Sequence, residues 1–454
     1  MSLAAALPEG RALFSSDEPL AFTLSAPFND LFQRARAEQE YSVVGALNYS
    51  EKGHNIAIDG VTISLRGHTS IRESECAFPK LKLDFPAEGK DATASTIFAG
   101  LKGIKLGTHC GESTDNTVTQ KYGRLPNEQA PLRETVVYRI LDALRVPTLK
   151  ARLARVSYVY TDAQPGKTPD QRNPVVRNAM ILETTGEALK RLGATDEVTE
   201  QQFTNARERF TTEDTAVLAF AEAMIGNFDW CVRMFPGDKY RCDDRHPLWN
   251  ITAAVGADGR ARPVMYDFDV SGMVAGHHRW FKEVFNSAFV ESNSPIDVEV
   301  LSQVQRTRTL FGRSDLDATR QRFVQRKPDA YRVLEVATLD PQGRRQIKQY
   351  LDAFFSAIES DQAFYRPVVV AKGTAAFADA GGGSVVCSTA GTIPVGTPVS
   401  QPLEKSGARI KVWLLDALWR WAPPIKCDAV HNGPVWIDAS AVGTDYPTAS
   451  LQQH

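Results

Sequence analysis

The sequence predicts an α+β protein in which a two-lobed domain is followed by a small, separate all-β barrel. Strand-like alternation of apolar and polar residues dominates the first part of the chain, whereas apolar residues spaced three and four apart dominate the second. A segment rich in Ala and Gly then separates the helical part from a run of short strand-like segments. These changes of pattern divide the chain into successive units.

The first lobe is expected to consist mainly of strands. Residues 18–65 form its β-rich lead-in, because strand-like segments there flank one short amphipathic helix over residues 26–39. Residues 66–190 form a small lobe, in which a helical pattern from Leu132 onward is followed by two further strands and a polar loop between them. The predicted strands are residues 20–27, 41–50, 54–67, 151–162 and 178–184.

A mainly helical second lobe is predicted for residues 191–367, with amphipathic helices over residues 297–312, 315–326 and 344–361. Residues 368–383 are predicted to be a linker, and residues 384–446 a small β-barrel, because short strands there alternate with Gly, Pro and Ser turns. The barrel carries aromatic residues and prolines that either line a binding groove or fill its small core. These residues are Trp419, Trp421 and Pro423.

Polar residues suited to phosphoryl transfer follow one another between Ile225 and Gly272. That chemistry needs a carboxylate to orient the attacking hydroxyl, an Asn and one or two Asp residues to hold Mg²⁺, and a Lys on the phosphates. Because Asp and Asn are common in turns and helix caps, each of these residues taken singly is more often structural than catalytic. The segments IGNFDW, HPLWN and PVMYDFDVSG supply Asp229, Asn250, Asp267 and Asp269 in that order.

The last two acids are predicted to share a cation. MYDFDV alternates apolar and acidic residues, so it is predicted to be a strand with both carboxylates on one face. Two like charges there are costly unless a cation or a donor lies between them, and a metal ion is the simplest such partner. Asp229 follows the apolar helical segment TAVLAFAEAMIGN, so we expect it in a loop just past a buried helix end.

Composition excludes several classes of protein. The 454 residues are 43% hydrophobic and 23% charged with a formal net charge of -2, which argues against a general nucleic-acid or membrane-surface binder. No apolar run reaches the ~18 residues of a membrane span, and residues 1–10 lack the pattern of a signal peptide. No P-loop, G-x-S-x-G or H-E-x-x-H motif occurs, which removes three large enzyme classes as simple interpretations.

The six cysteines predict three local disulfides and therefore an exported protein, periplasmic or extracellular. Each pair lies within one predicted unit. No CxxC motif with the spacing of a zinc site occurs, so zinc is not expected. The middle pair brackets a loop whose charged segment DDRH is either solvated or a lid over a substrate site. The predicted pairs are Cys76 with Cys110, Cys231 with Cys242, and Cys387 with Cys427.

From about Val61 to about Tyr365 the chain resembles the CotH-type atypical protein kinases of the spore coat and of secreted bacterial proteins. The segments that carry the resemblance are SLRGHTSIRESECAFPKLKLDF, PLRETVVYRILDALRVPT, NAMILETTGEALKRLG and PVMYDFDVSGM. Their order along the chain matches the family. The C-terminal part, with its closing GPVWIDAS, resembles a bacterial SH3-type module, and such modules bind peptidoglycan or peptides.

The resemblance implies a role for each acidic position. Asp229 would be the catalytic base, Asn250 and Asp267 would bind the metal, and Asp269 would be a second acid near the metals. In ordinary kinases about five residues separate the base from the metal-binding Asn, so the longer insertion here must loop out. The predicted Cys231 to Cys242 bridge would close that insertion.

The same resemblance implies residues that hold ATP. Lys82 or Lys105 would contact the phosphates, with Lys82 preferred. Glu134 would be the ion-pair partner of that Lys, although a solvated helix-start glutamate is an equal alternative. Glu183 lies where the family crosses between lobes, and Arg66 begins the RGHTS segment that would cover the phosphates.

The sequence therefore predicts transfer of phosphoryl groups from ATP, with Mg²⁺ or Mn²⁺, to Ser or Thr hydroxyls of an exported or envelope protein. One alternative is a catalytically degenerate kinase-like scaffold, which the SH3-like module anchors to the cell wall or to partner peptides. Another is a small-molecule kinase on the same body. No nucleic-acid partner and no membrane span are expected.

Overall fold

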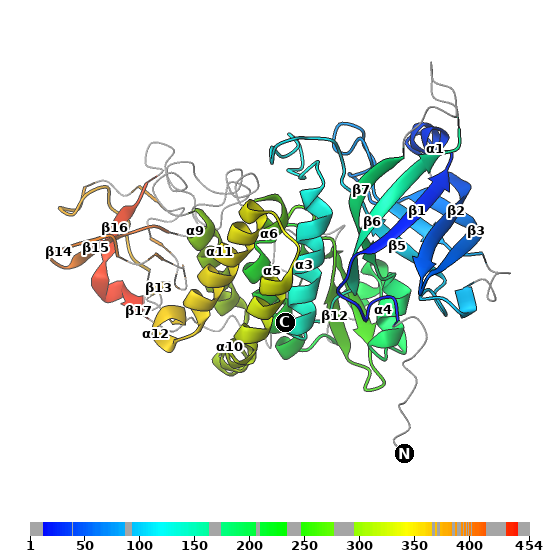
Figure 1. The fold of residues 1–454 in the computed structure, drawn as a ribbon. Coiled ribbons are helices and arrows are strands. Elements are labelled where there is room, and N and C mark those ends of the chain that lie inside the picture. Colours follow the sequence, from blue (N-terminus) through cyan, green and yellow to red (C-terminus); the bar gives the residue numbers. More distant parts are fainter. Residues whose placement is uncertain are drawn as a thin grey trace.

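The structure is a computed structural model of the chain. It describes residues 12–38, 40–86, 93–162, 174–205, 209–233, 247–276 and 295–365, and between residues 368 and 443 it describes 368–369, 373–383, 386–387, 392–393, 395, 397, 399–400, 402–414 and 433–443. Figure 1 shows a strand-rich part at one end, helices in the middle and a smaller strand-rich part at the other end.

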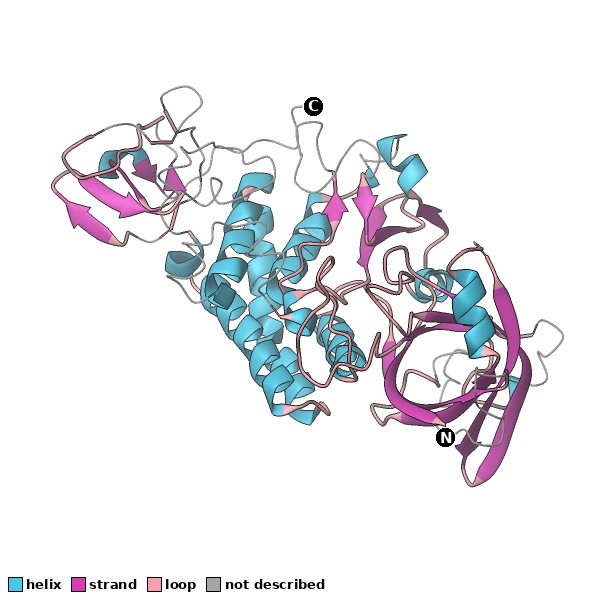
Figure 2. Cartoon of the chain, turned by 90° about the horizontal axis from the view of Figure 1, so that it is seen from above, coloured by secondary structure: helices cyan, strands magenta, loops and turns pink. Residues whose placement is uncertain are grey.

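The first part is a closed barrel with the strand order β1-β2-β3-β4-β5-β7-β6. Successive neighbours pair antiparallel, except that β1 closes the ring by pairing parallel to β6. Figure 2 shows these strands curving into a ring. The strands are β1 (Leu20–Ala26), β2 (Ser42–Glu51), β3 (His54–Leu65), β4 (Leu81–Asp84), β5 (Gly103–Gly107), β6 (Ala151–Tyr160) and β7 (Val175–Leu182).

Alternate residues of the strands fill the barrel. In β4, Leu81 and Leu83 are fully buried inside, whereas Lys82 between them is exposed on the outside. The helix α1 (Phe28–Ala35) places Phe28 against the ring of Tyr158, with ring centroids 5.7 Å apart. The predicted lead-in and small lobe thus contribute strands to one and the same barrel.

The middle part packs helices around one large apolar core. The helix α5 is buried from Thr215 to Ile225, and Thr211 caps its start by accepting a hydrogen bond from the Asp214 N–H. Gly226, with φ of 63°, ends it in the left-handed conformation. The helices are α3 (Gln129–Ala143), α4 (Thr185–Arg191), α5 (Thr212–Ile225), α6 (Gly272–Ala275), α9 (Pro295–Leu310), α10 (Arg313–Val336), α11 (Pro341–Ile358) and α12 (Asp361–Phe364), with a 3-10 helix η3 (Glu200–Asn205).

Two small sheets lie among these helices. One has the order β12-β11-β8, and the other pairs β10 with β9. Their short strands place the segments around Asp229, Asn250 and Asp267 next to one another. The strands are β8 (Asp196–Val198), β9 (Cys231–Val232), β10 (Leu248–Trp249), β11 (Ile251–Val255) and β12 (Ala261–Met265).

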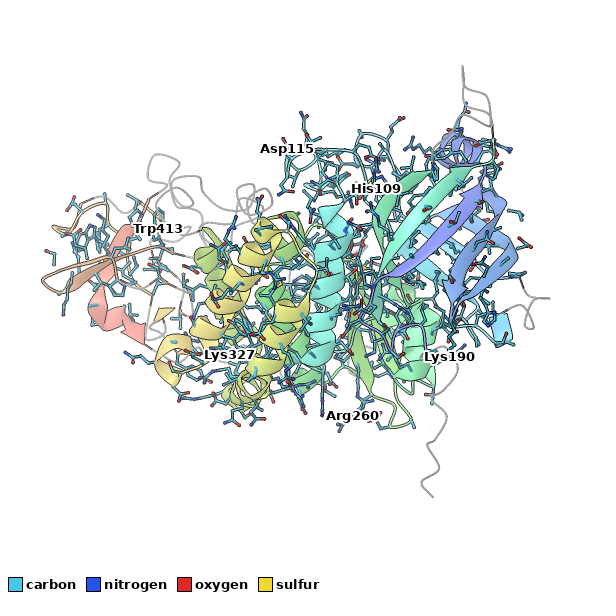
Figure 3. All side chains as sticks on the ribbon, in the orientation of Figure 1. His109, Asp115, Lys190, Arg260, Lys327 and Trp413 are labelled. Carbon is cyan, nitrogen blue, oxygen red and sulfur yellow. A yellow bond between two sulfur atoms is a disulfide. The ribbon has the colours of Figure 1, made fainter. Side chains whose placement is uncertain are left out.

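The C-terminal part has its own small apolar core. A three-stranded sheet with the order β14-β15-β16 lies beside the pair β13-β17, and Trp413, labelled in Figure 3, is 4% exposed in this part. Trp419, Trp421 and Pro423 lie outside the described residues. The elements are β13 (Val368–Val369), β14 (Glu404–Ser406), β15 (Arg409–Val412), β16 (Val435–Asp438), η7 (Ala439–Ala441) and β17 (Val442–Gly443). An SH3-like barrel here stays a prediction.

One of the three predicted disulfides is described completely, and it is confirmed: Cys76 and Cys110 are joined. Cys231 and Cys387 are each disulfide-bonded, whereas Cys242 and Cys427 lie outside the described residues. None of the helices in the described part of the chain is long and apolar enough to cross a membrane.

Candidate active site

The alternation in MYDFDV predicted a strand, and this prediction is wrong: Asp267 and Asp269 lie on a turn. The strand β12 ends at Met265, and Asp267 takes the left-handed conformation with φ of 66°. Its N–H donates a hydrogen bond to the Tyr138 hydroxyl at 3.0 Å. Asp tolerates this conformation better than most residues. The two carboxylates do lie close together, but a turn places them there and not the alternation of a strand.

A buried lysine lies between the two carboxylates. Lys80 Nζ is 2.5 Å from Asp267 Oδ1 and 2.9 Å from Asp269 Oδ2. Although burial alone would lower it, these carboxylates raise the pKa of Lys80 above its ordinary value. The predicted shared cation is therefore an ammonium in this structure, supplied by the residue just before β4.

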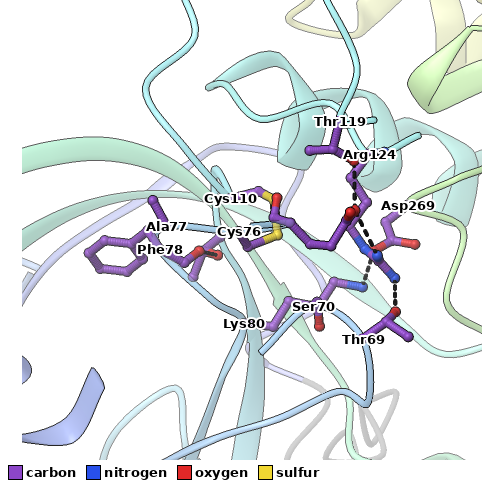
Figure 4. The surroundings of a disulfide bond; sticks show 12 residues. Thr69, Ser70, Cys76, Ala77, Phe78, Lys80, Cys110, Thr119, Arg124 and Asp269 are labelled. Carbon is purple, nitrogen blue, oxygen red and sulfur yellow. Dashed lines mark hydrogen bonds and ion pairs between the residues drawn. A yellow bond between two sulfur atoms is a disulfide. The ribbon is translucent and has the colours of Figure 1, made fainter. Parts of the chain in front are cut away.

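Arg124 is the second cation on Asp269. Its Nε donates to Asp269 Oδ2 at 2.8 Å, so both cations contact the same carboxylate oxygen (Figure 4). Burial would raise the pKa of Asp269, but Arg124 and Lys80 lower it below its usual value. Asp269 Oδ1 is buried and accepts no hydrogen bond from the described residues.

Glu134 on α3 completes the buried charge cluster. Its Oε1 accepts a hydrogen bond from the Phe268 N–H at 3.3 Å, between the two aspartates, and its side chain is 4% exposed. Burial raises the pKa of Glu134 to about 7, even though the positive charge of Lys80 opposes the rise. The alternative of a solvated helix-start glutamate is wrong, and the lysine it interacts with is Lys80.

Two further basic residues surround this cluster. The Arg66 guanidinium has Nε and Nη2 buried without a hydrogen-bond partner among the described residues, and its charge acts on Lys80, Lys105 and Glu134. Burial, followed by the positive charge of Arg66, lowers the pKa of Lys105 to about 8. Lys105 Nζ donates to Thr185 Oγ1 at 2.9 Å. Buried guanidinium nitrogens without a partner are costly and favour an anionic ligand.

Asp229 and Asn250 are in direct contact, as the prediction required. The Asn250 amide donates to Asp229 Oδ2 at 3.0 Å and to its backbone carbonyl at 2.6 Å, and Trp249 Nε1 donates to Asp229 Oδ1 at 3.1 Å. The Asn250 carbonyl in turn accepts from the Tyr266 N–H at 3.1 Å, next to Asp267. Thus the two ends of the insertion meet as expected, and its residues 234–246 lie outside the described part.

A backbone hydrogen bond ties the two motif segments together. The Gly272 N–H, three residues after Asp269, donates to the carbonyl of Gly226 at 2.9 Å, three residues before Asp229. The chain end of α5 is thereby fixed to the start of α6. This link sets the separation between the two groups of acids.

Two of the predicted residues have their side chains engaged elsewhere. Lys82 pairs with the exposed Asp84 at 2.8 Å, so that Lys80 and not Lys82 contacts the aspartates. The Glu183 carboxylate accepts from Arg191 Nη2 at 2.9 Å and from the Lys150 N–H at 3.0 Å. Both contacts of Glu183 brace the junction between β7 and α4.

Lys80, Arg124 and Glu75 are site residues that the sequence did not single out. Lys80 has the same strand parity as Lys82, so PKLK could have suggested either residue. Arg124 lies in a loop without a motif, and Glu75 lies in the segment SLRGHTSIRESECAFPKLKLDF, where no pattern distinguishes it from its neighbours. Only the contacts of the folded chain identify them.

The donor set fits a divalent cation such as Mg²⁺ or Mn²⁺. Asp267, Asp269 and the Asn250 amide offer the oxygen ligands these ions prefer, and the unpartnered Asp269 Oδ1 is available for one bond. Within the described ranges, no group of three or more His, Cys, Asp and Glu side chains is arranged around a common metal position. Asn is not one of these four residue types, so Asn250 is not considered in that statement.

No family model matches the chain, and the search of curated proteins finds no match. Among solved structures, the chain is similar to the Helicobacter pylori proinflammatory kinase CtkA, with 10% sequence identity and a TM-score of 0.32 over 63% of this chain and 90% of that one. A similarity at this level carries no inference about activity. The function therefore has to be argued from the side chains.

Proposed function

We propose that this protein transfers the γ-phosphoryl group of ATP to a Ser or Thr hydroxyl with the help of Mg²⁺ or Mn²⁺. The observation that carries the proposal is the contact network in which Lys80 joins Asp267 to Asp269 while Asn250 joins Asp229 to the same turn. Phosphoryl transfer needs a base, oxygen ligands and a cation for the phosphates in one place. The network supplies all three.

Asp229 is the proposed base. Its carboxylate is oriented by donors from Trp249 and Asn250, and its N–H is held by Asn227 Oδ1 at 2.9 Å. A carboxylate fixed in this way can orient a substrate hydroxyl and accept its proton as the oxygen attacks phosphorus. The bond from phosphorus to the ADP oxygen breaks in the same transfer.

Asp267, Asp269 and Asn250 are the proposed metal ligands. The bound ion would neutralise charge on the transferring phosphoryl group. Lys80, Lys105 and Arg66 are the proposed phosphate-binding cations, since Lys80 is buried between the acids, Lys105 and Arg66 are half-buried near them, and Arg66 Nε and Nη2 have no hydrogen-bond partner among the described residues. Glu134 would keep Lys80 in position from α3, and Glu183 would fix the segment between the lobes.

The substrate is proposed to be an exported or envelope protein. The Cys76–Cys110 bond supports folding in an oxidising compartment. The C-terminal part is proposed to act as an SH3-like module that binds peptidoglycan or peptides and so brings the enzyme to its substrate. The predicted CotH-type relationship remains part of this proposal.

Transfer of ³²P from ATP to a protein substrate tests the proposal in the wild type and in Asp229→Asn and Asp267→Asn. We expect both variants to lose at least about a hundredfold in rate, because each removes a group used in the transition state. Asp84→Asn is the matched control, since Asp84 is a partly exposed carboxylate whose ion pair among the described residues is with Lys82. Equal rates in all four proteins would overturn the assignment.

Nucleotide binding separates the enzyme from the degenerate scaffold. A ligand that binds only the folded state raises its melting temperature. We expect ATP with Mg²⁺ or Mn²⁺ to shift the unfolding of the wild type and to shift that of Asp267→Asn less. The absence of any shift at millimolar nucleotide would favour the scaffold.

A further inference from the structure

Arg124 makes several contacts in the site, but the proposed chemistry gives it no role. Besides Asp269, its Nη2 donates to Thr69 Oγ1 at 2.7 Å and its Nη1 lies 3.6 Å from Glu75 Oε2. Arg124 and Glu75 are 7% and 3% exposed. The guanidinium thus donates to one buried carboxylate and one hydroxyl and forms a longer ion pair with a second buried carboxylate, while its Nη1 has no hydrogen-bond partner among the described residues.

Arg124 and Lys80 contact the same oxygen of Asp269 and leave its other oxygen without a partner among the described residues. Arg124 Nε and Lys80 Nζ both take Oδ2, and Oδ1 keeps no partner among the described residues. A lysine has no comparable fixed geometry, because its ammonium is a point charge on a flexible stem. The arrangement therefore orients Asp269 with one free oxygen, which is the form a metal ligand needs.

Two features restrain Glu75: a hydrogen bond to its side chain and the disulfide next to it in the sequence. Its Oε2 accepts from the Thr119 hydroxyl at 2.7 Å, and its backbone directly precedes Cys76 of the disulfide. The disulfide joins Cys76 to Cys110, whose carbonyl accepts from the Phe78 N–H at 3.0 Å. Figure 4 shows the disulfide beside Lys80, Arg124 and Asp269. The cross-link consequently fixes the backbone that carries Glu75.

We propose that Arg124 is a positioning residue for Asp269, held in place by Glu75, whose position depends on the Cys76–Cys110 disulfide. The inference rests on the proposed function, since it assigns Asp269 to the metal. Outer residues of this kind typically change metal affinity by about 10- to 100-fold. The disulfide would thereby set the metal affinity of the site besides stabilising the fold.

The test measures the dissociation constant of Mn²⁺ in the presence of ADP by titration calorimetry, alongside the Mn²⁺ dependence of the transfer rate. Arg124→Gln should weaken Mn²⁺ binding about tenfold or more, and Arg124→Lys, which keeps the charge without the fork, should recover part of the loss. Arg72→Gln is the matched control, because Arg72, like Arg124, lies near the Tyr122 ring, and among the described residues no ion pair joins it to the acids of the site. Melting temperatures of all variants identify any that fail to fold.

A double-mutant cycle tests the link through Glu75. We expect Glu75→Gln and the pair Cys76→Ala with Cys110→Ala each to weaken Mn²⁺ binding, and the combination to weaken it no more than the stronger of the two. Fully additive effects would overturn the route from the disulfide through Glu75. A lower melting temperature of Arg124→Gln with an unchanged dissociation constant would make Arg124 structural only.

The wild type distinguishes failure of this inference from failure of the proposed function. If the wild type binds Mn²⁺ with ADP and transfers phosphate while Arg124→Gln does so equally well, only the positioning role is wrong. If the wild type does neither, the proposed function and the inference both fail.

Discussion

Lys80 and Asp267 lie 187 positions apart in the sequence, yet Lys80 Nζ is 2.5 Å from Asp267 Oδ1. The contact joins the residue before β4 of the barrel to the turn after β12 in the helical part. Asp269 and Glu134 also lie next to Lys80, so this one ammonium interacts with three acidic side chains. Removing it would leave Asp269 with Arg124 alone and Asp267 without its ion pair.

Lys80→Met is therefore expected to lower the free energy of unfolding by about 3 to 5 kcal/mol, the range for breaking one side of a buried ion pair. Lys82→Met, the matched control on the same face of the strand, removes only an exposed pair with Asp84 and should stay within about 1 kcal/mol of the wild type. Urea unfolding of the three proteins measures the difference. If both variants lowered the free energy of unfolding by the same small amount, Lys80 would not be needed to neutralise the buried carboxylates.

Much of the fold could be predicted from local patterns. Alternation predicted the strands β1, β2 and β3, and three-to-four spacing predicted helices that correspond to α9, α10 and α11. The parallel pairing of β1 with β6, which closes the barrel, could not be predicted, because it joins residues about 130 positions apart with no signal in either strand. Pairing over such distances depends on the whole fold.

The candidate site could be predicted in part. Asp229 and Asn250 were expected to meet, and they do so through a direct hydrogen bond. The sequence analysis weighed Lys82 against Lys105 and did not consider Lys80, although Lys80 and Lys82 have the same parity in PKLK. The turn at Asp267 was missed because a left-handed residue leaves the alternation of MYDFDV unchanged in the sequence. Arg124 and Glu75 had no local pattern at all.

Glu134 should make stability fall as pH rises from 4.5 to 7. Its pKa goes from the ordinary 4.5 to about 7 in the folded state, so the folded state holds this proton more tightly than the unfolded chain does. The unfolding free energy contributed by that proton is present below pH 4.5 and is lost by pH 7, in total about 3 kcal/mol. In Glu134→Gln this part of the pH dependence should be absent. Parallel pH profiles for wild type and variant, from urea unfolding, would contradict it.

Lys105→Met should make the protein more stable at pH 7 while weakening nucleotide binding. The pKa of Lys105 is lowered from 10.5 to about 8, so its charged form costs folding free energy below pH 8, and the cost disappears as pH rises to 10.5. We expect a gain of about 1 to 3 kcal/mol at pH 7 that shrinks at pH 9.5. The exposed Lys102→Met is the control and should change stability by less than about 0.5 kcal/mol. A loss of stability in Lys105→Met at pH 7 would refute the prediction.

Asn250 combines a backbone role with a side-chain role, which two substitutions separate. Its φ is 53°, a conformation that Gly adopts freely and Ala does not. Asn250→Ala should therefore unfold about 1 kcal/mol more easily than Asn250→Gly. Both lose the amide that contacts Asp229, so both should lose phosphoryl transfer to the same extent. If Asn250→Gly kept full transfer activity, the amide would have no part in the site.

A single methyl group added at Gly272, whose N–H donates to the Gly226 carbonyl, is expected to destabilise the protein strongly. A Cβ on Gly272 would lie 1.9 Å from Tyr350 Oη, and that hydroxyl is itself fixed by a hydrogen bond to Glu299 at 2.9 Å. Because Tyr350 is fully buried, neither side can move without breaking packing. Gly272→Ala should lower the unfolding free energy by about 1 to 3 kcal/mol.

Gly186→Ala is the matched control for that substitution. Gly186 lies within α4, and a Cβ there would meet no atom within 4 Å. Since Ala is favoured over Gly inside a helix, this variant should gain about 0.5 to 1 kcal/mol. Urea unfolding and phosphoryl transfer are then compared. Because the Gly272 N–H fixes the start of α6 to the end of α5, Gly272→Ala should also reduce transfer, whereas Gly186→Ala should leave it unchanged. Unchanged transfer in a folded Gly272→Ala protein would show that this hydrogen bond does not set the separation of the acids.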